Sequence, residues 1–531
     1  MGLTITAGIK NLQELNPASR GVTQMVNRKY QSNRDHRINQ AKEATMSRPA
    51  KIGANTSFSL CSERITAFGG LLGLVKFLDL FQCEKIFESY YQAPSRKPLL
   101  GHYRMVLGIV LLLFIGFNRI WHMIYIRMDS MVCAILGVNK LPDASTFWRY
   151  INALGLNEAK SLLKVASVLR ERVWIHCRLN LKHIHIDIDT TVETIYGEQE
   201  GGRVGHNTSH RGKKGYRPVL CFIEETREFL TGKLRKGETI SGKEISKLIS
   251  SFHLYLPSCV KKVTLRADGE FFGRKTINAA LAAGYHFIIG IRRSTPKFNH
   301  KKWYHIHKKD KIQYNECLHQ PNGWQTPCRF VAMRIHKRSK TKSENTQLQL
   351  WEDDEYTYRT FATDLKGRPH SIIHEYDKRA DVENLIGEAK REGLAAIPST
   401  KFKNNYAYFQ IVMLTYNIWR YFKMVAEVAL GSKPSHNENK KNKIATYTEL
   451  LIRTARLKLL MIGAKIVFHA NRYEVKYSIY DTRVVELFRF YNTLDQKRHN
   501  SSENDWENLK AAWMQENSCA KNAKNYAYGF N

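Results

Sequence analysis

Four side chains that suit metal and phosphate chemistry recur at helical spacing in the segment Tyr376–Lys390. They are Tyr376, Arg379, Glu383 and Lys390. If the segment forms one helix that turns by about 100° per residue, the four fall within an arc of about 60°. The apolar residues between them form a neighbouring stripe that can pack on a core. The segment therefore predicts a helix that aims one carboxylate, two cations and a phenol at a ligand such as a metal ion with phosphates.

Two further carboxylates stand at the ends of predicted strands. The segment His183–Asp189 alternates, with three isoleucines on one face and two histidines and two aspartates on the other. A second strand is predicted over Lys262–Ala267 and is followed by Asp268. Carboxylates from two strands and one helix, here Asp189, Asp268 and Glu383, can hold two magnesium ions about 4 Å apart. Such a pair of ions activates a water or a 3′-hydroxyl for in-line phosphoryl transfer.

Helix geometry gives the neighbours of Glu383 separate roles. Arg379 lies one turn earlier, about 6 Å along the axis, and could contact the scissile phosphate or an adjacent one. Lys390 lies about 10 Å away in the other direction, which suits a flanking phosphate. Tyr376 points the same way as Arg379 and offers a phenol for backbone contact or for helix orientation. The alternative is that the four side chains form a solvated face of ordinary charges beside a core stripe. Glu388 lies off the arc and is predicted to be a solvated residue.

The elements that must position these residues divide the chain into six predicted segments. They are a basic arm at 1–55, a helical domain at 56–175 that is expected either to bind DNA or to be purely structural, the first part of an α/β core at 176–295, a β-strand insertion at 296–370, C-terminal helices of the core at 371–430, and a region for dimerisation or DNA contact at 431–531. The apolar run Met105–Phe117 is about 13 residues long, which is too short to span a membrane. We expect it to be a buried helix.

The predicted insertion is basic and rich in strands. The strands are expected at Phe330–Ile335, Thr346–Trp351 and Tyr356–Thr363. Three tryptophans are interleaved with its lysines and arginines, at positions 303, 324 and 351. Basic and aromatic residues together can hold a nucleic-acid backbone and stack on unpaired bases. The alternative, aromatic strand residues that serve only as core, stays open.

The composition favours a nucleic acid as partner. Lysine and arginine outnumber aspartate and glutamate by 83 to 48, which gives a formal charge of +35. Such a surplus strengthens association with polyanions, although a basic enzyme of another class or a ribosome-associated protein remains an alternative. The nine cysteines are scattered without zinc spacing, and the N-terminus lacks the order of a signal peptide. These features predict reduced thiols and a cytoplasmic location.

The motifs together resemble those of bacterial insertion-sequence DDE transposases. The pattern Y-x2-R-x3-E-x6-K in Tyr376–Lys390 is similar to the signature around the third catalytic residue of that family. The segments Asp187–Thr191 and Arg266–Phe272 resemble the strands that carry its two aspartates. The 115 residues from Asp268 to Glu383 match the strand-rich insertion of one branch of the family, whose members also carry a helical N-terminal domain.

This resemblance implies an α/β fold with an RNase H-like core, interrupted by a β-rich insertion and preceded by an all-helical domain. The expected activity is transposition, in which a homodimer binds and pairs the inverted-repeat ends of a mobile element, cuts the flanking DNA and joins the 3′-hydroxyl to target DNA. Asp189, Asp268 and Glu383 would be catalytic and would hold two Mg²⁺ or Mn²⁺ ions. Tyr376, Arg379 and Lys390 would bind DNA. The location would be the bacterial cytoplasm, at the nucleoid and away from any membrane.

Two ambiguities remain on the first strand. Asp187 shares a face with Asp189, but Asp189 is preferred as the metal ligand because it directly precedes the Thr-Thr pair, as in the family pattern. Asp187 would then support the site from behind. His183 and His185 suggest a zinc hydrolase of the H-x-H-x-D-H type, yet that pattern requires a histidine where this chain has Ile188.

Two other functions compete with transposition. A nuclease would use the same carboxylates without the joining step, and a strand-transfer assay would separate the two. A repressor of transposition would bind DNA through a decayed site. The presence of all three carboxylates and of the Tyr-Arg-Glu-Lys arc counts against decay.

Overall fold

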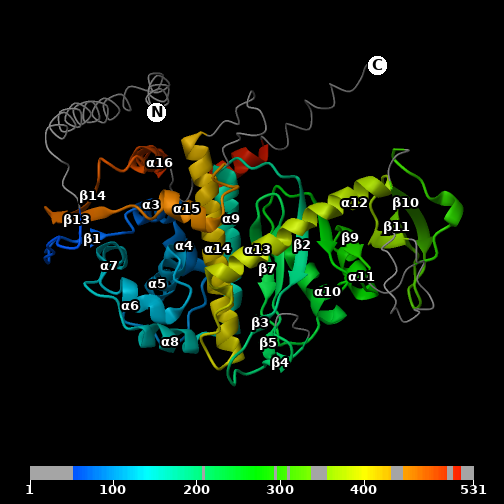
Figure 1. Cartoon of the computed structure of the whole chain (residues 1–531), viewed down its shortest axis with the longest axis horizontal. Coiled ribbons are helices and arrows are strands. Elements are labelled where there is room, and N and C mark those ends of the chain that lie inside the picture. Colours follow the sequence, from blue (N-terminus) through cyan, green and yellow to red (C-terminus); the bar gives the residue numbers. More distant parts are fainter. Residues whose placement is uncertain are drawn as a thin grey trace, which may run out of the picture.

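A mixed eight-stranded sheet forms the centre of the computed structural model, which describes residues 52–205, 210–291, 296–307, 311–336, 356–431, 446–498 and 506–515. Helices from the first part of the described chain lie on one side of this sheet (Figure 1). The fold is therefore of the mixed α/β class that the sequence predicts. Most of the expected basic arm at 1–55 and the strand expected over Thr346–Trp351 lie outside the described residues.

The helical part of the chain is built on one apolar helix, α5. Its helices and 3₁₀ turn are α3 (Leu71–Leu80), α4 (Cys83–Tyr90), α5 (His102–Ile115), η1 (Ile120–His122), α6 (Met123–Ile126), α7 (Ser130–Leu136), α8 (Ala144–Ala153) and α9 (Leu156–His176). All residues from Met105 to Ile115 are buried, which confirms the predicted core helix. Among the described residues no single helix is long and apolar enough to cross a membrane, and the pair that passes by composition, α5 with Ile120–Ile126, is bent by 89°.

The central sheet has the order β10-β11-β12-β9-β8-β2-β6-β7. Its strands are β2 (His183–Thr190), β6 (Val219–Ile223), β7 (Glu228–Lys233), β8 (Lys262–Ala267), β9 (His286–Gly290), β10 (Ile312–His319), β11 (Cys328–His336) and β12 (Tyr356–Thr363). β2, β8 and β9 run parallel, and the other neighbours pair antiparallel. The three isoleucines of β2 are at most 1% exposed, as its alternation predicts.

Strands from the predicted insertion continue the central sheet at one edge. β12 pairs antiparallel with β9, and β11 and β10 follow outward. β11 and β12 confirm the strands expected at Phe330–Ile335 and Tyr356–Thr363, whereas β10 is a strand that the sequence pattern does not predict. Short connecting elements between the strands include α10 (Gly242–Ser250), η2 (Phe252–Leu254), α11 (Arg274–Ala282) and η3 (His300–Lys302).

Two small sheets complete the strands. β3 (Glu193–Thr194), β4 (Arg203–Val204) and β5 (Lys214–Tyr216) form one of them beside the central sheet. β1 (Ile65–Thr66), β13 (Ala464–His469) and β14 (Arg472–Tyr477) form the other. Because β1 pairs with β13, the later part of the chain, with α15 (Ile452–Leu459) and α16 (Arg483–Arg498), packs back on the helical part.

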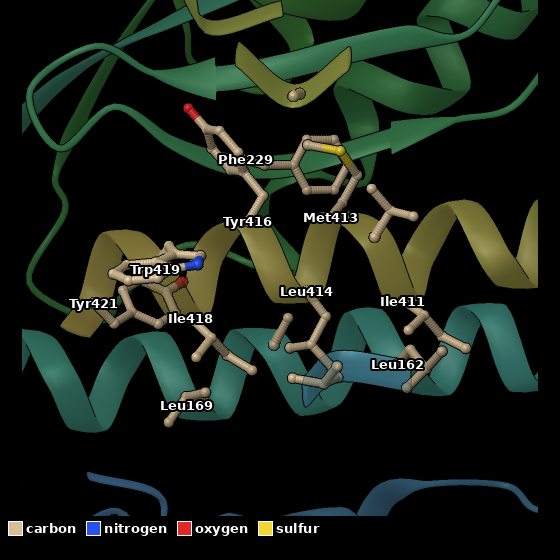
Figure 2. Packing of buried hydrophobic residues seen from close by; sticks show 14 of the residues in the cluster. Leu162, Leu169, Phe229, Ile411, Met413, Leu414, Tyr416, Ile418, Trp419 and Tyr421 are labelled. Carbon is tan, nitrogen blue, oxygen red and sulfur yellow. The ribbon is translucent and has the colours of Figure 1, made fainter. Parts of the chain in front are cut away.

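The long helix α14 (Phe402–Leu430) joins the helical part to the sheet. Its residues are buried almost all round, because it lies between α9 and the sheet (Figure 2). Leu414 and Ile418 point toward α9, while Tyr416 points toward the strand that carries Phe229. The Asn417 side chain bonds both the amide and the carbonyl of Phe229, at 2.8 and 2.7 Å, so polar groups also fix this contact.

The segment Tyr376–Lys390 is not the single helix that the spacing predicts. α12 (Pro369–Asp377) passes through a 3₁₀ turn, η4 (Lys378–Ala380), into α13 (Asp381–Ala389), which ends in a π turn, η5 (Lys390–Leu394). A 3₁₀ turn advances by about 120° per residue, so the arc computed for a uniform helix holds only approximately. Local hydrogen-bond shifts of this kind leave the apolar spacing intact, and sequence periodicity therefore does not reveal them.

Candidate active site at the ends of strands β2 and β8

The three predicted carboxylates line one cavity of about 770 Å³. β2 and β8 are parallel, with Ile188 opposite Ala267, so Asp189 and Asp268 stand at the same edge of the sheet. Glu383 reaches the cavity from the first turn of α13, where its side chain is exposed. In Figure 1, α12 and α13 cross in front of β2, the strand that carries Asp189. The fold therefore brings together side chains that are up to 194 positions apart in the chain.

Burial and like charges raise the pKa of Asp189 to about 6. Burial is the largest cause, and the nearby carboxylates of Asp268 and Glu383 act in the same direction. The opposing influences are the Arg379 guanidinium, 3.2 Å from Oδ2, and the Thr190 amide, which donates to Oδ1 at 2.8 Å. An acid surrounded in this way gains from a cation that offsets the repulsion.

Arg379 lies behind Asp189 and is itself nearly buried. Its Nη2 donates to the Ile188 carbonyl at 3.1 Å and pairs with Asp189 at 3.2 Å. Its side chain is 9% exposed, yet it lines the cavity. In this structure the guanidinium therefore holds the end of β2, and its expected contact with a phosphate stays a prediction.

Lys390 and Tyr376 occupy different positions relative to the cavity. Lys390 lines the cavity, and its Nζ donates to the Val192 carbonyl at 2.8 Å and pairs with Glu193 at 3.4 Å. Tyr376 is not among the lining residues: its hydroxyl donates to the Ala267 carbonyl at 3.3 Å, directly before Asp268. Of backbone contact and helix orientation, the two functions expected for this phenol, the geometry favours orientation of helix α12 against β8.

Several other lining residues were not predicted to be functional. Arg119, from the turn after α5, brings a cation from the helical part of the chain. Arg217 pairs with Glu270 at 2.6 Å, and Thr190 donates to the same carboxylate at 3.1 Å. The other oxygen of Glu270 is buried and accepts no hydrogen bond. Glu270 could have been noticed in the sequence, because it stands two positions after Asp268. The positions of Arg119 and Arg217 in the sequence give no such signal.

Asp187 occupies a position separate from the cavity. Its two oxygens accept from Nε and Nη2 of Arg266 at 2.7 and 2.8 Å, and both side chains are at most 3% exposed. Arg266 also donates to the Glu375 carbonyl of α12 at 2.8 Å. Of the two aspartates on β2, only Asp189 lines the cavity.

The two histidines of β2 do not line the cavity and contact other protein side chains instead. His183 lies 2.8 Å from the Thr264 hydroxyl, and His185 bridges Glu225 and Glu375 at 2.7 and 2.8 Å. Although burial lowers the pKa of His185, the hydrogen bonds to these two glutamates outweigh it and raise that pKa to about 9. At neutral pH the His185 ring is therefore a cation that ties β2 to α12.

The donor set of the cavity fits hard divalent cations. Among the described residues, one group of three possible metal ligands has ligand atoms that all lie within 4.8 Å of one another, and it consists of His185, Glu224 and Glu225. The three carboxylates of the cavity are therefore spaced more widely than that. Two such ions lie about 4 Å apart, and each ion lies about 2.1 Å from its carboxylate oxygens. Carboxylates on the outer sides of the pair can therefore be up to about 8 Å from one another. Oxygen donors, wide spacing and the unpaired oxygen of Glu270 are compatible with such a pair.

Comparison with known proteins gives the chain a family. Among solved structures it is similar to the piggyBac transposase in a synaptic complex with hairpin DNA, determined by cryo-electron microscopy. The TM-score is 0.38 and the sequence identity 11%, over 73% of this chain and 80% of that chain. No curated protein matches. A family model described as "Transposase DDE domain group 1" matches residues 59–498, a range that includes all the site residues named above. The chain therefore belongs to the DDE transposases, the family that its motifs resemble.

Proposed function

We propose that this transposase binds the inverted-repeat ends of its own element, cuts the flanking DNA strand and joins the freed 3′-hydroxyl to target DNA. The observation that carries this proposal is the convergence of Asp189, Asp268 and Glu383 in one open cavity, with cations on its wall. These three carboxylates would hold two Mg²⁺ or Mn²⁺ ions. When bound, such ions activate the attacking oxygen and stabilise the leaving one.

The residues around the carboxylates have supporting tasks in this scheme. Arg379 favours the ionised form of Asp189 and, through the Ile188 carbonyl, fixes the end of β2. Tyr376 fixes the end of β8 through the Ala267 carbonyl. Lys390 and Arg119 supply positive charge on the cavity wall, where DNA phosphates on either side of the cut would lie. Contact of Arg379 and Tyr376 with phosphates remains part of the proposal.

The topology supports an RNase H-like core for this chemistry. Within the sheet, the order β7-β6-β2-β8-β9 combines a meander of β2, β6 and β7 with the parallel strands β8 and β9. We propose that residues 176–295 and 371–430 form this core. Residues 296–370 would then be an insertion, 56–175 would bind DNA, and 431–531 would contribute to dimerisation or DNA contact. The protein would act as a homodimer on the nucleoid of a bacterium.

Oligonucleotides that carry the element ends would test this proposal. We expect the wild-type protein to produce metal-dependent cleavage and a joined product. Asp268→Asn should lower both by at least about a hundredfold, because a metal ligand matters at least as much as the groups that orient it. A matched control is Asp79→Asn, which removes a half-exposed carboxylate on α3 that pairs with Arg498.

Each rival function predicts a different result. Cleavage by the wild type without joined product would favour a nuclease. Binding without cleavage, together with no effect of Asp268→Asn, would favour a repressor. Equal losses in the Asp268→Asn and Asp79→Asn variants would argue against the cavity as the active site.

A further inference from the structure

The side of α13 opposite Glu383 carries a buried charge, Glu388, although the sequence predicts a solvated residue at this position. Glu388 is 3% exposed, pairs with Arg420 of α14 and accepts the Ile452 amide at 2.7 Å. The prediction of a solvated residue is therefore wrong. Glu388 does point away from the cavity, as its position on the helix predicts, but on that side it meets α14 and the start of α15. No local sequence pattern reveals this contact.

Two more ion pairs hold the same helical segment. Before Glu388, Asp381 pairs at 2.9 Å with Arg227, from the turn between β6 and β7. After it, Glu392 of the π turn pairs with Arg456 of α15. The Nε of Arg456 also donates to the Phe114 carbonyl of α5 at 3.1 Å, so this anchor extends into the helical part. Asp381, Glu388 and Glu392 thus link α13 and its π turn to three separate elements.

The apolar side of α13 does not by itself fix the rotation of the helix. Val382, Ile386 and Ala389 are buried, but their contacts are non-directional and tolerate small rotations. With nine residues between a 3₁₀ turn and a π turn, α13 is also short for a helix. A buried carboxylate is different, because its ion pair and its bond from a backbone amide are satisfied in one orientation only.

We propose that Glu388 is a positioning residue, which sets the rotation of α13 through Arg420 and the Ile452 amide and so aims Glu383 and Lys390 into the cavity. This inference rests on the proposed function, in which Glu383 holds a metal ion. It makes the start of α15 part of the support of the active site. Mutation of a buried partner that orients a metal ligand commonly weakens metal binding by about 10- to 100-fold.

The test is Mn²⁺ binding to the full-length protein, measured by calorimetric titration. Glu388→Gln keeps the size of the side chain and an oxygen for the Ile452 amide but removes the charge that pairs with Arg420. We expect its Mn²⁺ dissociation constant to rise at least about tenfold. The matched control is Glu228→Gln, which breaks the buried pair between Glu228 of β7 and Arg170 of α9. That control should be less stable and yet bind Mn²⁺ as the wild type does.

Metal-free hydrogen exchange gives a second readout. Amides in 381–394 should exchange faster in Glu388→Gln than in Glu228→Gln at matched stability. Glu388→Asp, which keeps the charge, should recover part of the Mn²⁺ affinity and provides a variant should Glu388→Gln fail to fold. Wild-type Mn²⁺ affinity in Glu388→Gln, or an equal loss in Glu228→Gln, would overturn the inference. A wild-type protein that binds no Mn²⁺ would overturn the proposed function instead, whereas faster exchange confined to Glu388→Gln would still support positioning of α13.

Discussion

At the scale of single residues, Asp189 combines a place in the candidate active site with a cost in stability. Its pKa in the fold, about 6, exceeds its ordinary value of 3.8, so the folded protein binds this proton more tightly than the unfolded chain does. Above pH 6 the ionised carboxylate therefore destabilises the metal-free fold. We expect Asp189→Asn to raise the free energy of unfolding by about 1–3 kcal/mol at pH 7.5, measured by denaturant titration without metal.

The pH dependence provides the control for this prediction. As pH falls from 6 toward 4, the wild-type aspartate takes up its proton, and the advantage of Asp189→Asn should shrink. A variant that is less stable than the wild type at pH 7.5 would contradict the argument. Such a result would mean that the ion pair with Arg379 outweighs burial and repulsion.

The candidate metal ligands could be predicted from the sequence, but their supports could not. Asp189, Asp268 and Glu383 were found because strand ends and helical spacing are local properties of the chain. Arg119 and Glu388 depend on which face of one element meets another. An isolated arginine after an apolar run, or a glutamate off the active arc, carries no local mark of the neighbour that it will contact.

At the scale of elements, His185 ties β2 to α12 through a proton. Its pKa of about 9 in the fold exceeds the ordinary value of 6.5, because hydrogen bonds to Glu225 and Glu375 outweigh the effect of burial. The stability that this proton contributes is fully present below pH 6.5 and is lost as pH rises through 9. We expect His185→Gln to cost about 1–3 kcal/mol at pH 6.5 and much less at pH 9.5, measured by denaturant titration.

A histidine on the exposed end of β10 supplies the comparison. His319→Gln should follow the wild-type pH profile, since the exposed side chain gains little from folding. A cost of His185→Gln that stays constant from pH 6.5 to 9.5 would contradict the role assigned to the proton.

The strands were easier to predict than the continuity of the helices. β2, β8 and β12 follow from alternation and β-branched content, which reflect the environment of each strand directly. The 3₁₀ and π turns around α13 left no trace in the apolar spacing. The π turn contacts α14, and its Glu392 pairs with Arg456 of α15, so its partners lie later in the chain.

At the scale of the whole molecule, the charge of +35 predicts strongly salt-dependent DNA binding. A protein that neutralises about six phosphates loses roughly a thousandfold in affinity between 50 and 200 mM salt. We expect log affinity to fall linearly with log salt concentration, measured by the anisotropy of a labelled duplex. Arg119→Ala should reduce that slope by about one, because it removes one cation from the cavity wall.

Lys262→Ala is the control for the salt measurement. It removes the same charge from the start of β8, at the opposite end of the strand from Asp268. A slope that changes equally in both variants would mean that DNA contact is not centred on the cavity. A slope near zero in the wild type would contradict phosphate-dominated binding altogether.

The order of the sheet exceeded what the sequence could predict. The insertion was expected as a separate β-rich segment, whereas β12 pairs with β9 and extends the central sheet. Edge pairing between strands about 70 residues apart depends on backbone geometry that side-chain patterns do not encode. The boundaries of the predicted segments remain predictions for this reason.

The pairing of β1 with β13 also constrains when the protein can become active. Ile65 lies opposite Lys465, so 400 residues separate the two strands. At a synthesis rate of about 5–20 residues per second, β1 has no partner for roughly 20–80 s after it is made. The Ile452 amide that holds Glu388 is made in the same late interval. A nascent chain therefore carries the three candidate metal ligands before the residues that hold the helix of Glu383 are made, and we expect the cavity to be assembled only near the end of translation.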